Sequence, residues 1–394
     1  MIERTIITDK TLCCGCQACM KACPVGCITM MKDEEGFIYP VSSEHCIHCK
    51  KCEAVCPILN QPKSQIQDKI VYAGKSKKHS VWKASSSGGA FYEICNSWGE
   101  SDTLYFGAVW DGLTVKHDCV EGIENIGPLQ KSKYIYSDTN GSFSKIKNYL
   151  DQGRYVVFSG TPCQVAGLKN YLNRDYERLL TIDLVCHGVG SPDVFHNCIS
   201  LLEKRYSGII EKIEFRSKKE CYDFDHLSLI TINGKGIYII NDPYTQLFLS
   251  QACLRPSCGL NCQFRNINRQ GDITIADFKG LVDVFPSLRG YKENYSTIII
   301  NTKKAFTILE SLDSKMNLLK CEIEDIEKYN PLISGQSQFA VENQNREPFF
   351  KKYISDHEVA IEEFMSSEVE EYNPSIKRRI WNLLPFFIRH QIGR

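Results

Sequence analysis

The stretch C-C-G-C-Q-A-C-M-K-A-C-P, residues 13–24, contains five cysteines, and residues 46–57, C-I-H-C-K-K-C-E-A-V-C-P, repeat its spacing. Both runs follow the pattern C-x2-C-x2-C-x3-C-P. Short loops between cysteines at this spacing aim successive sulfur atoms inward, and the following turn carries the fourth cysteine past them. The duplicated pattern therefore predicts that residues 1–60 form one module built around two metal centres.

Pairs of such runs are typical of bacterial ferredoxins that hold two 4Fe-4S clusters, in which the fourth cysteine of each run ligates the cluster of the other run. The predicted ligand sets are Cys13, Cys16, Cys19 with Cys56, and Cys46, Cys49, Cys52 with Cys23. Tetrahedral zinc also binds cysteine, but zinc sites pair two C-x2-C dyads and need neither the third cysteine nor the C-P ending. Cys14 and Cys27 have no place in the pattern, so we interpret them as extra thiols.

The overall charge of the chain favours no particular class of partner. Lysine plus arginine and aspartate plus glutamate each number 47 in 394 residues, so the formal net charge is zero and no global field attracts nucleic acid. No run approaches the roughly 18 apolar residues of a membrane span. Residues 1–10 lack the apolar core of a secretory signal, which predicts a cytoplasmic location where thiols stay reduced. The 20 cysteines are therefore expected to be ligands rather than disulfides.

Composition divides the rest of the chain into three parts. Residues 61–69 are polar and indicate a linker, and residues 70–345 are expected to form the main domain. Strand patterns alternate with helix patterns in that domain, which predicts an α/β fold with a mixed sheet. Residues 346–394 are expected to form a helical region ending in a basic amphipathic tail, which either docks onto the domain or makes a peripheral contact with an anionic membrane surface.

Local patterns predict several elements of the main domain. Residues 70–74 and 296–302 are apolar runs typical of buried strands. An Asp-Gly pair within residues 104–118 and an Asn-Gly pair within residues 233–236 predict two hairpins, because both dipeptides favour tight turns between strands.

Two cysteines of the main domain follow predicted strands. Residues 154–172 indicate a strand, a turn with Cys163 and a helix, and residues 179–192 indicate a strand that ends at Cys186 and His187. In α/β sheets the loops at the strand ends carry function. Cys163 and Cys186 would form a third four-thiolate site together with Cys258 and Cys262. Spacing alone leaves the alternative of structural thiols equally open.

Residues 84–98 indicate a loop that leads into a helix. Small residues at such an entrance let a phosphate approach the backbone N–H groups at the positive end of the helix. This makes Ser86, Ser87, Gly88 and Gly89 candidates for binding a nucleotide pyrophosphate. A simple helix cap is the alternative interpretation.

These motifs together resemble the coenzyme F420 hydrogenase/dehydrogenase beta-subunit family, to which 7-hydroxymethyl chlorophyll a reductase also belongs. The resemblance rests on the ferredoxin runs and on five later motifs in the same order, S-S-S-G-G-A-F, S-G-T-P-C-Q-V-A-G-L, D-L-V-C-H-G-V-G-S-P, L-R-P-S-C and D-I-T-I-A-D-F. It implies an α/β flavin-binding oxidoreductase domain that holds FAD and its own 4Fe-4S cluster, fused here to a ferredoxin module.

The resemblance also implies roles for individual residues. FAD would contact Ser87, Gly88, Gly89, Lys133 and Tyr134. The flavin and substrate region would be lined by Thr161, Gln164, Asp183, His187 and Asp277. Asp183 and His187 would be the catalytic pair, with His187 as the proton donor because imidazole titrates near neutral pH. The cluster of the main domain would be held by Cys163, Cys186, Cys258 and Cys262, with Cys253 as the alternative to Cys262.

Two departures separate the chain from the family pattern. The family's C-x2-C is C-x3-C here, at Cys258 and Cys262, so one ligand must reach from a longer loop. The family's G-D-F-W-G is A-D-F-K-G here, with Ala276 in place of glycine and Lys279 in place of tryptophan. The second change removes a flat stacking surface and introduces a cation beside the active site.

The implied cofactors connect two-electron and one-electron chemistry, since a flavin takes up hydride whereas iron–sulfur clusters take up single electrons. The chain is accordingly expected to be an F420H2 dehydrogenase-like enzyme whose partner is ferredoxin or another one-electron carrier. One alternative is a ferredoxin-dependent flavin reductase of another substrate, linked to surface-polysaccharide biosynthesis. The other is a non-catalytic electron-transfer subunit.

Overall fold

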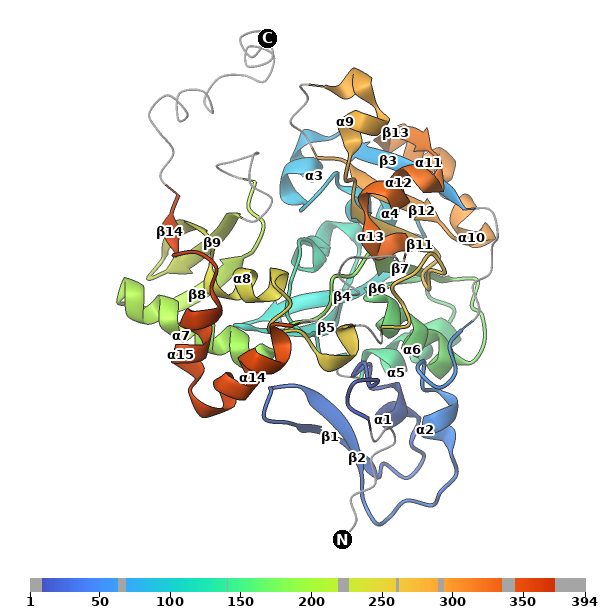
Figure 1. Ribbon diagram of the computed structural model, residues 1–394. Helices are drawn as coiled ribbons and strands as arrows, with labels where there is room; N and C mark the ends of the chain where they lie inside the picture. The colour runs from blue at the N-terminus through green and yellow to red at the C-terminus, as the bar shows by residue number, and fades with distance from the viewer. Residues whose placement is uncertain are drawn as a thin grey trace.

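The computed structural model describes residues 9–62, 69–139, 141–218, 227–259, 262–289, 294–334 and 344–372. Three parts are visible in Figure 1: the N-terminal module at the bottom, an eight-stranded sheet with its helices above it, and a smaller four-stranded sheet to one side. The two larger sheets lie within the residues predicted to form the main domain and the C-terminal helical region.

The N-terminal module contains α1 (Ala18–Ala22), β1 (Ile28–Lys32), β2 (Ile38–Ser42) and α2 (Lys51–Ala54), with β1 and β2 paired antiparallel. The two cysteine runs have the same backbone conformation. Gly15 and His48, which precede the second cysteine of each run, have φ angles of 70° and 54°, and Gln17 and Lys50, which follow it, have φ angles of 65° and 60°. The repeat in the sequence is therefore also a repeat in the structure.

The large sheet has the strand order β13-β3-β12-β11-β7-β6-β4-β5. Its strands are β3 (Ile70–Ser76), β4 (Leu104–Asp111), β5 (Thr114–Glu121), β6 (Val156–Gly160), β7 (Leu179–Leu184), β11 (Ile273–Asp277), β12 (Ser296–Ile300) and β13 (Met316–Cys321). Strands β4, β6, β7 and β11 are parallel to one another, whereas β5, β12 and β13 pair antiparallel with their neighbours. The carboxyl ends of the parallel strands therefore meet at one edge of the sheet.

Helices cover both faces of this sheet. They are α3 (His79–Ala84), α4 (Ala90–Cys95), α5 (Ser142–Asp151), α6 (Pro162–Leu172), α9 (Leu281–Val284), α10 (Lys303–Phe306), α11 (Leu309–Lys315), α12 (Ile323–Tyr329) and α13 (Pro331–Ser334). Val156 and Phe158 of β6 pack with α5 and α6, whereas Val157 between them packs with α4 on the other face. All three side chains are fully buried, as expected for a strand in a parallel sheet with both faces covered.

A second sheet has the order β14-β10-β9-β8, with β8 (Ile210–Glu214), β9 (Leu227–Ile232), β10 (Lys235–Ile240) and β14 (Glu370–Glu371). It shares a hydrophobic core with α7 (Pro192–Tyr206), α8 (Pro243–Leu249), α14 (Arg346–Ser355) and α15 (His357–Phe364). Short 3-10 helices complete the described elements, at Ile123–Asn125, Gly127–Leu129, Pro256–Cys258 and Pro286–Leu288.

The structure has the mixed α/β sheet and the ferredoxin-like N-terminal module that the sequence predicts. The two hairpins form β4–β5 and β9–β10, with Gly112 and Gly234 in left-handed conformations at the turns. No helix among the described residues is both long enough and apolar enough to cross a membrane. The basic tail, residues 376–394, lies outside the described residues.

Candidate functional site

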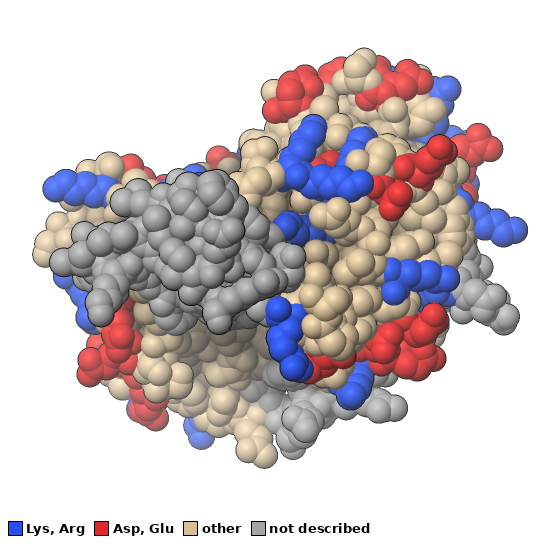
Figure 2. All heavy atoms as spheres, turned by 90° about the horizontal axis from the view of Figure 1, so that it is seen from above, with Lys and Arg blue, Asp and Glu red and all other residues tan. Residues whose placement is uncertain are grey.

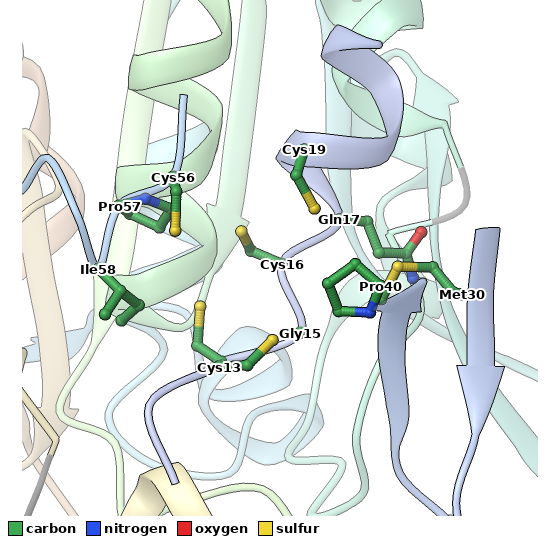
Figure 3. A pocket seen from close by; sticks show the side chains of 11 residues that line it. Cys13, Gly15, Cys16, Gln17, Cys19, Met30, Pro40, Cys56, Pro57 and Ile58 are labelled. Carbon is green, nitrogen blue, oxygen red and sulfur yellow. The ribbon is translucent and has the colours of Figure 1, made fainter. Parts of the chain in front are cut away.

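One cavity in the N-terminal module is lined by Cys13, Cys16, Cys19 and Cys56, the first predicted ligand set. In Figure 3 their sulfur atoms point toward one another, and Cys56 comes from the second cysteine run, as the crossed assignment requires. Met30, Pro40 and Ile58 provide apolar walls. Burial, together with the nearby Cys13 and Cys56 thiols, raises the pKa of Cys19 to about 12. An enclosed group of soft sulfur ligands with apolar walls suits an iron–sulfur cluster.

The second predicted set lies toward the surface of the module. Cys49 is exposed, and Cys23, Cys46 and Cys52 are partly buried. The sulfur atoms of Cys23 and Cys27 are 3.4 Å apart, and Cys46 interacts with Cys27 as well. Cys27, which the pattern leaves unassigned, is therefore a neighbour of this set.

The cysteines that follow the strands of the main domain lie close together. Cys163 follows β6 at the start of α6, and Cys186 follows the parallel strand β7, so both lie at the same edge of the sheet. Cys258 ends a 3-10 helix, and the N–H group of Val189 donates to its sulfur at 3.4 Å. Burial raises the pKa values of Cys186, Cys258 and Cys262, and the nearby Cys163 thiol raises each of them further.

Cys253 lies apart from these four cysteines. It is fully buried in the core of the second sheet, where Cys198 is its neighbour. The structure thus brings Cys262, and not Cys253, to Cys163 and Cys186. Among the described residues, no three His, Cys, Asp or Glu side chains are arranged to hold a single metal ion.

Cys14 lies where the N-terminal module meets the group of Cys163, Cys186, Cys258 and Cys262, which we call the strand-end set. Its thiol lies near enough to both Cys16 and Cys163 for them to shift its pKa, Cys16 upward and Cys163 downward. The approach is close because α6 carries Gly167 opposite Cys16: a Cβ atom at Gly167 would lie 2.9 Å from the sulfur of Cys16. The first ferredoxin set and the strand-end set are therefore adjacent in space.

Polar and charged groups gather further along the same edge, at the ends of β3 and β11. Asp277 ends β11 and accepts a hydrogen bond from Nη1 of Arg216 at 2.7 Å. Burial raises the pKa of Asp277, but Arg216, Ser87 and Lys218 together lower it by more, so the carboxylate is stabilised in its charged form. Its Oδ1 atom is buried and has no hydrogen-bond partner among the described residues.

Arg216 and Lys218 are functional candidates that the sequence did not single out. They lie on the loop after β8, and Nζ of Lys218 donates to the Trp82 carbonyl at 3.1 Å and lies 4.2 Å from the centre of the Trp82 ring. The only sequence signal was the basic run R-S-K-K directly after a strand. Figure 2, which views the molecule from the side opposite the N-terminal module, shows positive and negative side chains interspersed over the described surface.

The loop before α4 packs tightly against β3 and β12. The N–H group of Gly88 donates to Oγ of Ser296 at 2.9 Å, and a Cβ atom at Gly88 would lie 2.2 Å from the Gly74 carbonyl oxygen. Gly89 has a φ angle of 97° and immediately precedes α4. Ser86 accepts a hydrogen bond from the N–H group of Ser132 at 2.9 Å. Packing alone therefore accounts for the glycine at position 88.

Lys133 and Tyr134 lie in the next segment. Burial and the nearby Lys131 together lower the pKa of Lys133 to about 7. The Tyr134 ring stacks on Phe248, with ring centres 4.7 Å apart. Nε2 of His187 lies 3.2 Å from the carbonyl oxygen of the same Phe248. This aromatic group thus connects the end of β7 to the Lys133 segment.

The remaining candidates have structural contacts. Asp183 is fully buried; it accepts from Oγ1 of Thr274 and from the N–H group of Gln270 and pairs with Arg269 at 3.4 Å. Thr161 precedes α6, and its N–H group donates to Oε1 of Gln164 at 3.0 Å. The contacts of Asp183 hold the loop before β11. The bond between Thr161 and Gln164 holds the start of α6, which carries Cys163.

Comparison with known proteins gives matches over both parts of the chain. The profile that describes the C terminus of the coenzyme F420 hydrogenase/dehydrogenase beta subunit matches residues 153–363, and the profile described as a 4Fe-4S dicluster domain matches residues 12–59. An uncharacterized ferredoxin of Methanocaldococcus jannaschii is 42% identical over 52 residues, 13% of this chain and 68% of that protein.

Two further proteins match more of the chain, but with lower sequence identity. The coenzyme F420-dependent sulfite reductase of M. jannaschii is 24% identical over 365 residues, which are 89% of this chain and span 53% of the reductase. A chain in the structure of the F420-reducing nickel–iron hydrogenase complex of Methanosarcina barkeri is 15% identical, with a TM-score of 0.45 over 76% of this chain and 92% of that chain.

Proposed function

The chain belongs to the coenzyme F420 hydrogenase/dehydrogenase beta-subunit family and carries a 4Fe-4S dicluster domain, and on this premise we propose that it is an iron–sulfur flavoprotein that moves electrons between a two-electron substrate and one-electron carriers. A bound flavin would supply hydride exchange with the substrate and single-electron exchange with the clusters. The ligand sets we propose are the two crossed ferredoxin sets and the set of Cys163, Cys186, Cys258 and Cys262.

The observation that carries this proposal is the close approach of the first ferredoxin set to the strand-end set, where Gly167 of α6 lies against the Cys16 sulfur and Cys14 lies near Cys163. This closeness supports a path along which electrons pass from one proposed cluster site to the next. Cys52 of the second set is near Cys19 of the first, and the first set meets the strand-end set at Cys14. Beyond the strand-end set, β7 neighbours β11, whose last residue is Asp277. The polar and charged residues around Asp277, which we call the polar edge, would be the substrate end. The exposed Cys49 would face an external carrier.

The polar edge supports a role in binding the flavin. Arg216 and Lys218 supply positive charge beside Ser87, which suits the pyrophosphate of FAD, and Lys133 would bind a further anionic group. Gly88 and Gly89 would shape the loop, and Ser86 would attach it to the Ser132 segment. We propose that Tyr134 limits the site on its aromatic side and that Asp277 offers its unpartnered Oδ1 atom to the cofactor or substrate.

His187 is the proposed proton-transfer residue. Because the Phe248 carbonyl can only accept a hydrogen bond, Nε2 carries a proton, so any transfer to substrate takes place at Nδ1. Asp183 is buried under this strand end and would act by positioning the loop rather than by contact with substrate. Thr161 and Gln164 would act in the same way on Cys163 through the start of α6.

The substrate proposed first is reduced coenzyme F420, in keeping with the family and with the F420-dependent sulfite reductase. A second candidate is another conjugated substrate, as in a ferredoxin-dependent reductase of surface-polysaccharide synthesis. The observation that favours it is Lys279, an exposed cation where the family has tryptophan. In both cases the partner would be ferredoxin or another one-electron carrier.

The test is the flavin content of anaerobically purified protein and its oxidation of F420H2 with an artificial one-electron acceptor. About one FAD per chain and turnover of F420H2 are the expected results. Bound FAD without turnover would favour the second candidate. Clusters without FAD would contradict the flavoprotein proposal and favour an electron-transfer subunit.

A further inference from the structure

Arg255 is fully buried between the main domain and the N-terminal module. It belongs to the R-P-S-C segment of the main domain, but its guanidinium contacts the module. Nε donates to the Cys13 carbonyl at 2.7 Å, and Nη2 donates to the Ile38 carbonyl at 2.9 Å. Nη2 also lies 3.7 Å from the sulfur of Cys13. Rings of Phe37, Tyr39 and Tyr136 surround the group, the nearest with its centre 4.3 Å away.

This buried cation has no carboxylate partner among the described residues. Its Nη1 atom is buried and makes no hydrogen bond there. Arg269, the other arginine that is buried in the described part of the chain, behaves as expected, since it pairs with Asp183 at 3.4 Å. Burying a charge is costly unless an opposite charge or a complete set of hydrogen bonds compensates it. Some other negative group should therefore face Arg255.

The nearest candidates are the proposed cluster ligands. Cys13 contacts Nη2, and the field of Arg255 also reaches Cys14 and Cys163. The close approach depends on Gly15, because a Cβ atom there would lie 2.9 Å from Nη1. No carboxylate of the described residues competes for this position.

We propose that Arg255 is the counter-ion of the first ferredoxin cluster, the one assigned to Cys13, Cys16, Cys19 and Cys56. This inference rests on the proposed function, which supplies that ligand set. Gain of one electron adds one negative charge to a cluster, and a nearby cation or hydrogen-bond donor stabilises the reduced state. Arg255 would thus raise the reduction potential of the cluster nearest the main domain. Because Cys258 follows only three residues later, one short segment would serve both the first cluster and the strand-end set.

The test is a redox titration of the full chain with dithionite as the reductant, followed by electron paramagnetic resonance. The signal missing from a Cys16→Ser variant identifies the first cluster. We expect Arg255→Gln to keep its iron and to shift the reduction equilibrium of that cluster at least tenfold toward the oxidised form, about 59 mV for one electron. Arg255→Lys should restore part of this shift, because it keeps the positive charge.

Arg346→Gln is the matched control. Arg346 spans the same interface, since it bonds to Glu35 of the module and donates to the Leu254 carbonyl at 2.7 Å, but its charge is already paired. Its removal should leave the potential of the first cluster unchanged. An unchanged potential in Arg255→Gln, or an equal shift in Arg346→Gln, would overturn the proposal.

Cluster loss is also informative. Loss in Arg255→Gln that Arg255→Lys prevents supports a need for the charge, whereas equal loss in both variants contradicts it and indicates a packing role. A wild-type protein without the signal of the first cluster would contradict the proposed function itself. The two failures are therefore distinguishable.

Discussion

Cys14 and Cys16 are near neighbours in the sequence, but their places in the cysteine pattern predict different effects of substitution. Both line the same cavity, but Cys16 belongs to the spacing pattern, in which Cys13, Cys16, Cys19 and Cys56 already make four ligands, and Cys14 does not. We expect Cys16→Ser to lose about four irons per chain and Cys14→Ser to lose none. Iron and acid-labile sulfide analysis measures both. Loss of flavin together with iron in Cys16→Ser would show that the division into two modules is wrong.

Lys133 makes flavin binding dependent on pH. Burial and Lys131 lower its pKa to about 7, and a bound phosphate would raise that pKa, so binding above pH 7 takes up a proton. FAD affinity of flavin-depleted protein should therefore fall as the pH rises above about 7, by at most tenfold per pH unit. Lys133→Met should bind FAD more weakly at low pH and without this slope.

A titration of flavin fluorescence at several pH values measures that slope. Lys83→Met, which removes an exposed lysine on α3, is the control and should keep it. A slope that persists in Lys133→Met would assign the proton to another group.

For single residues, the ligand positions that follow from the cysteine spacing were predictable. The charged contacts between segments far apart in the sequence were not. The crossed contribution of Cys56 follows from the duplicated run, because local loops dictate where each sulfur points. Arg216, Lys218 and Arg255 had no such signal. Each is positioned by contacts with segments far away in the sequence, such as Asp277, Trp82 and Cys13.

Among the elements, α6 controls the strand-end set because it begins at Pro162 and carries Cys163. The bond from the Thr161 N–H group to Gln164 closes its first turn. Gln164→Leu should lower the free energy of unfolding by about 1 kcal/mol, as for the loss of a helix cap, and should also deplete up to four irons per chain. Denaturant unfolding and iron analysis measure the two effects.

Asp356→Ala removes a comparable cap, since Asp356 accepts from the Val359 N–H group at 3.1 Å at the start of α15. It should lower stability by a similar ~1 kcal/mol and keep all iron. Equal iron loss in both variants would mean that general instability, and not the position of Cys163, explains the effect.

Elements with local signals were predictable from the sequence. The β4–β5 and β9–β10 hairpins follow from glycines that adopt left-handed turns, and β6, α6 and β7 follow from apolar runs that end at polar loops. The four-stranded sheet was not predicted as a separate unit. Its edge strand β14 has only two residues and pairs with β10 from more than a hundred residues away, which no local pattern encodes.

At the scale of the whole molecule, the N-terminal module is joined to the main domain through the proposed redox sites. Tyr136 donates to the Gly15 carbonyl at 2.6 Å, Thr139 donates to the Cys16 carbonyl at 3.2 Å, and Arg255 contacts Cys13. The ion pair of Lys32 with Asp193 adds a peripheral contact. The order of the sites was not predictable, because it depends on how the module docks against α5 and α6 (Figure 1).

The proposed function requires three cluster sites in one chain, the third of them at the ends of β6 and β7. The most direct test is the iron and acid-labile sulfide content of anaerobically purified wild-type protein and its Cys163→Ser variant. Three clusters of four irons predict about twelve irons per chain in the wild type and about eight in the variant. About eight irons in both proteins would contradict a third cluster and confine the clusters to the N-terminal module.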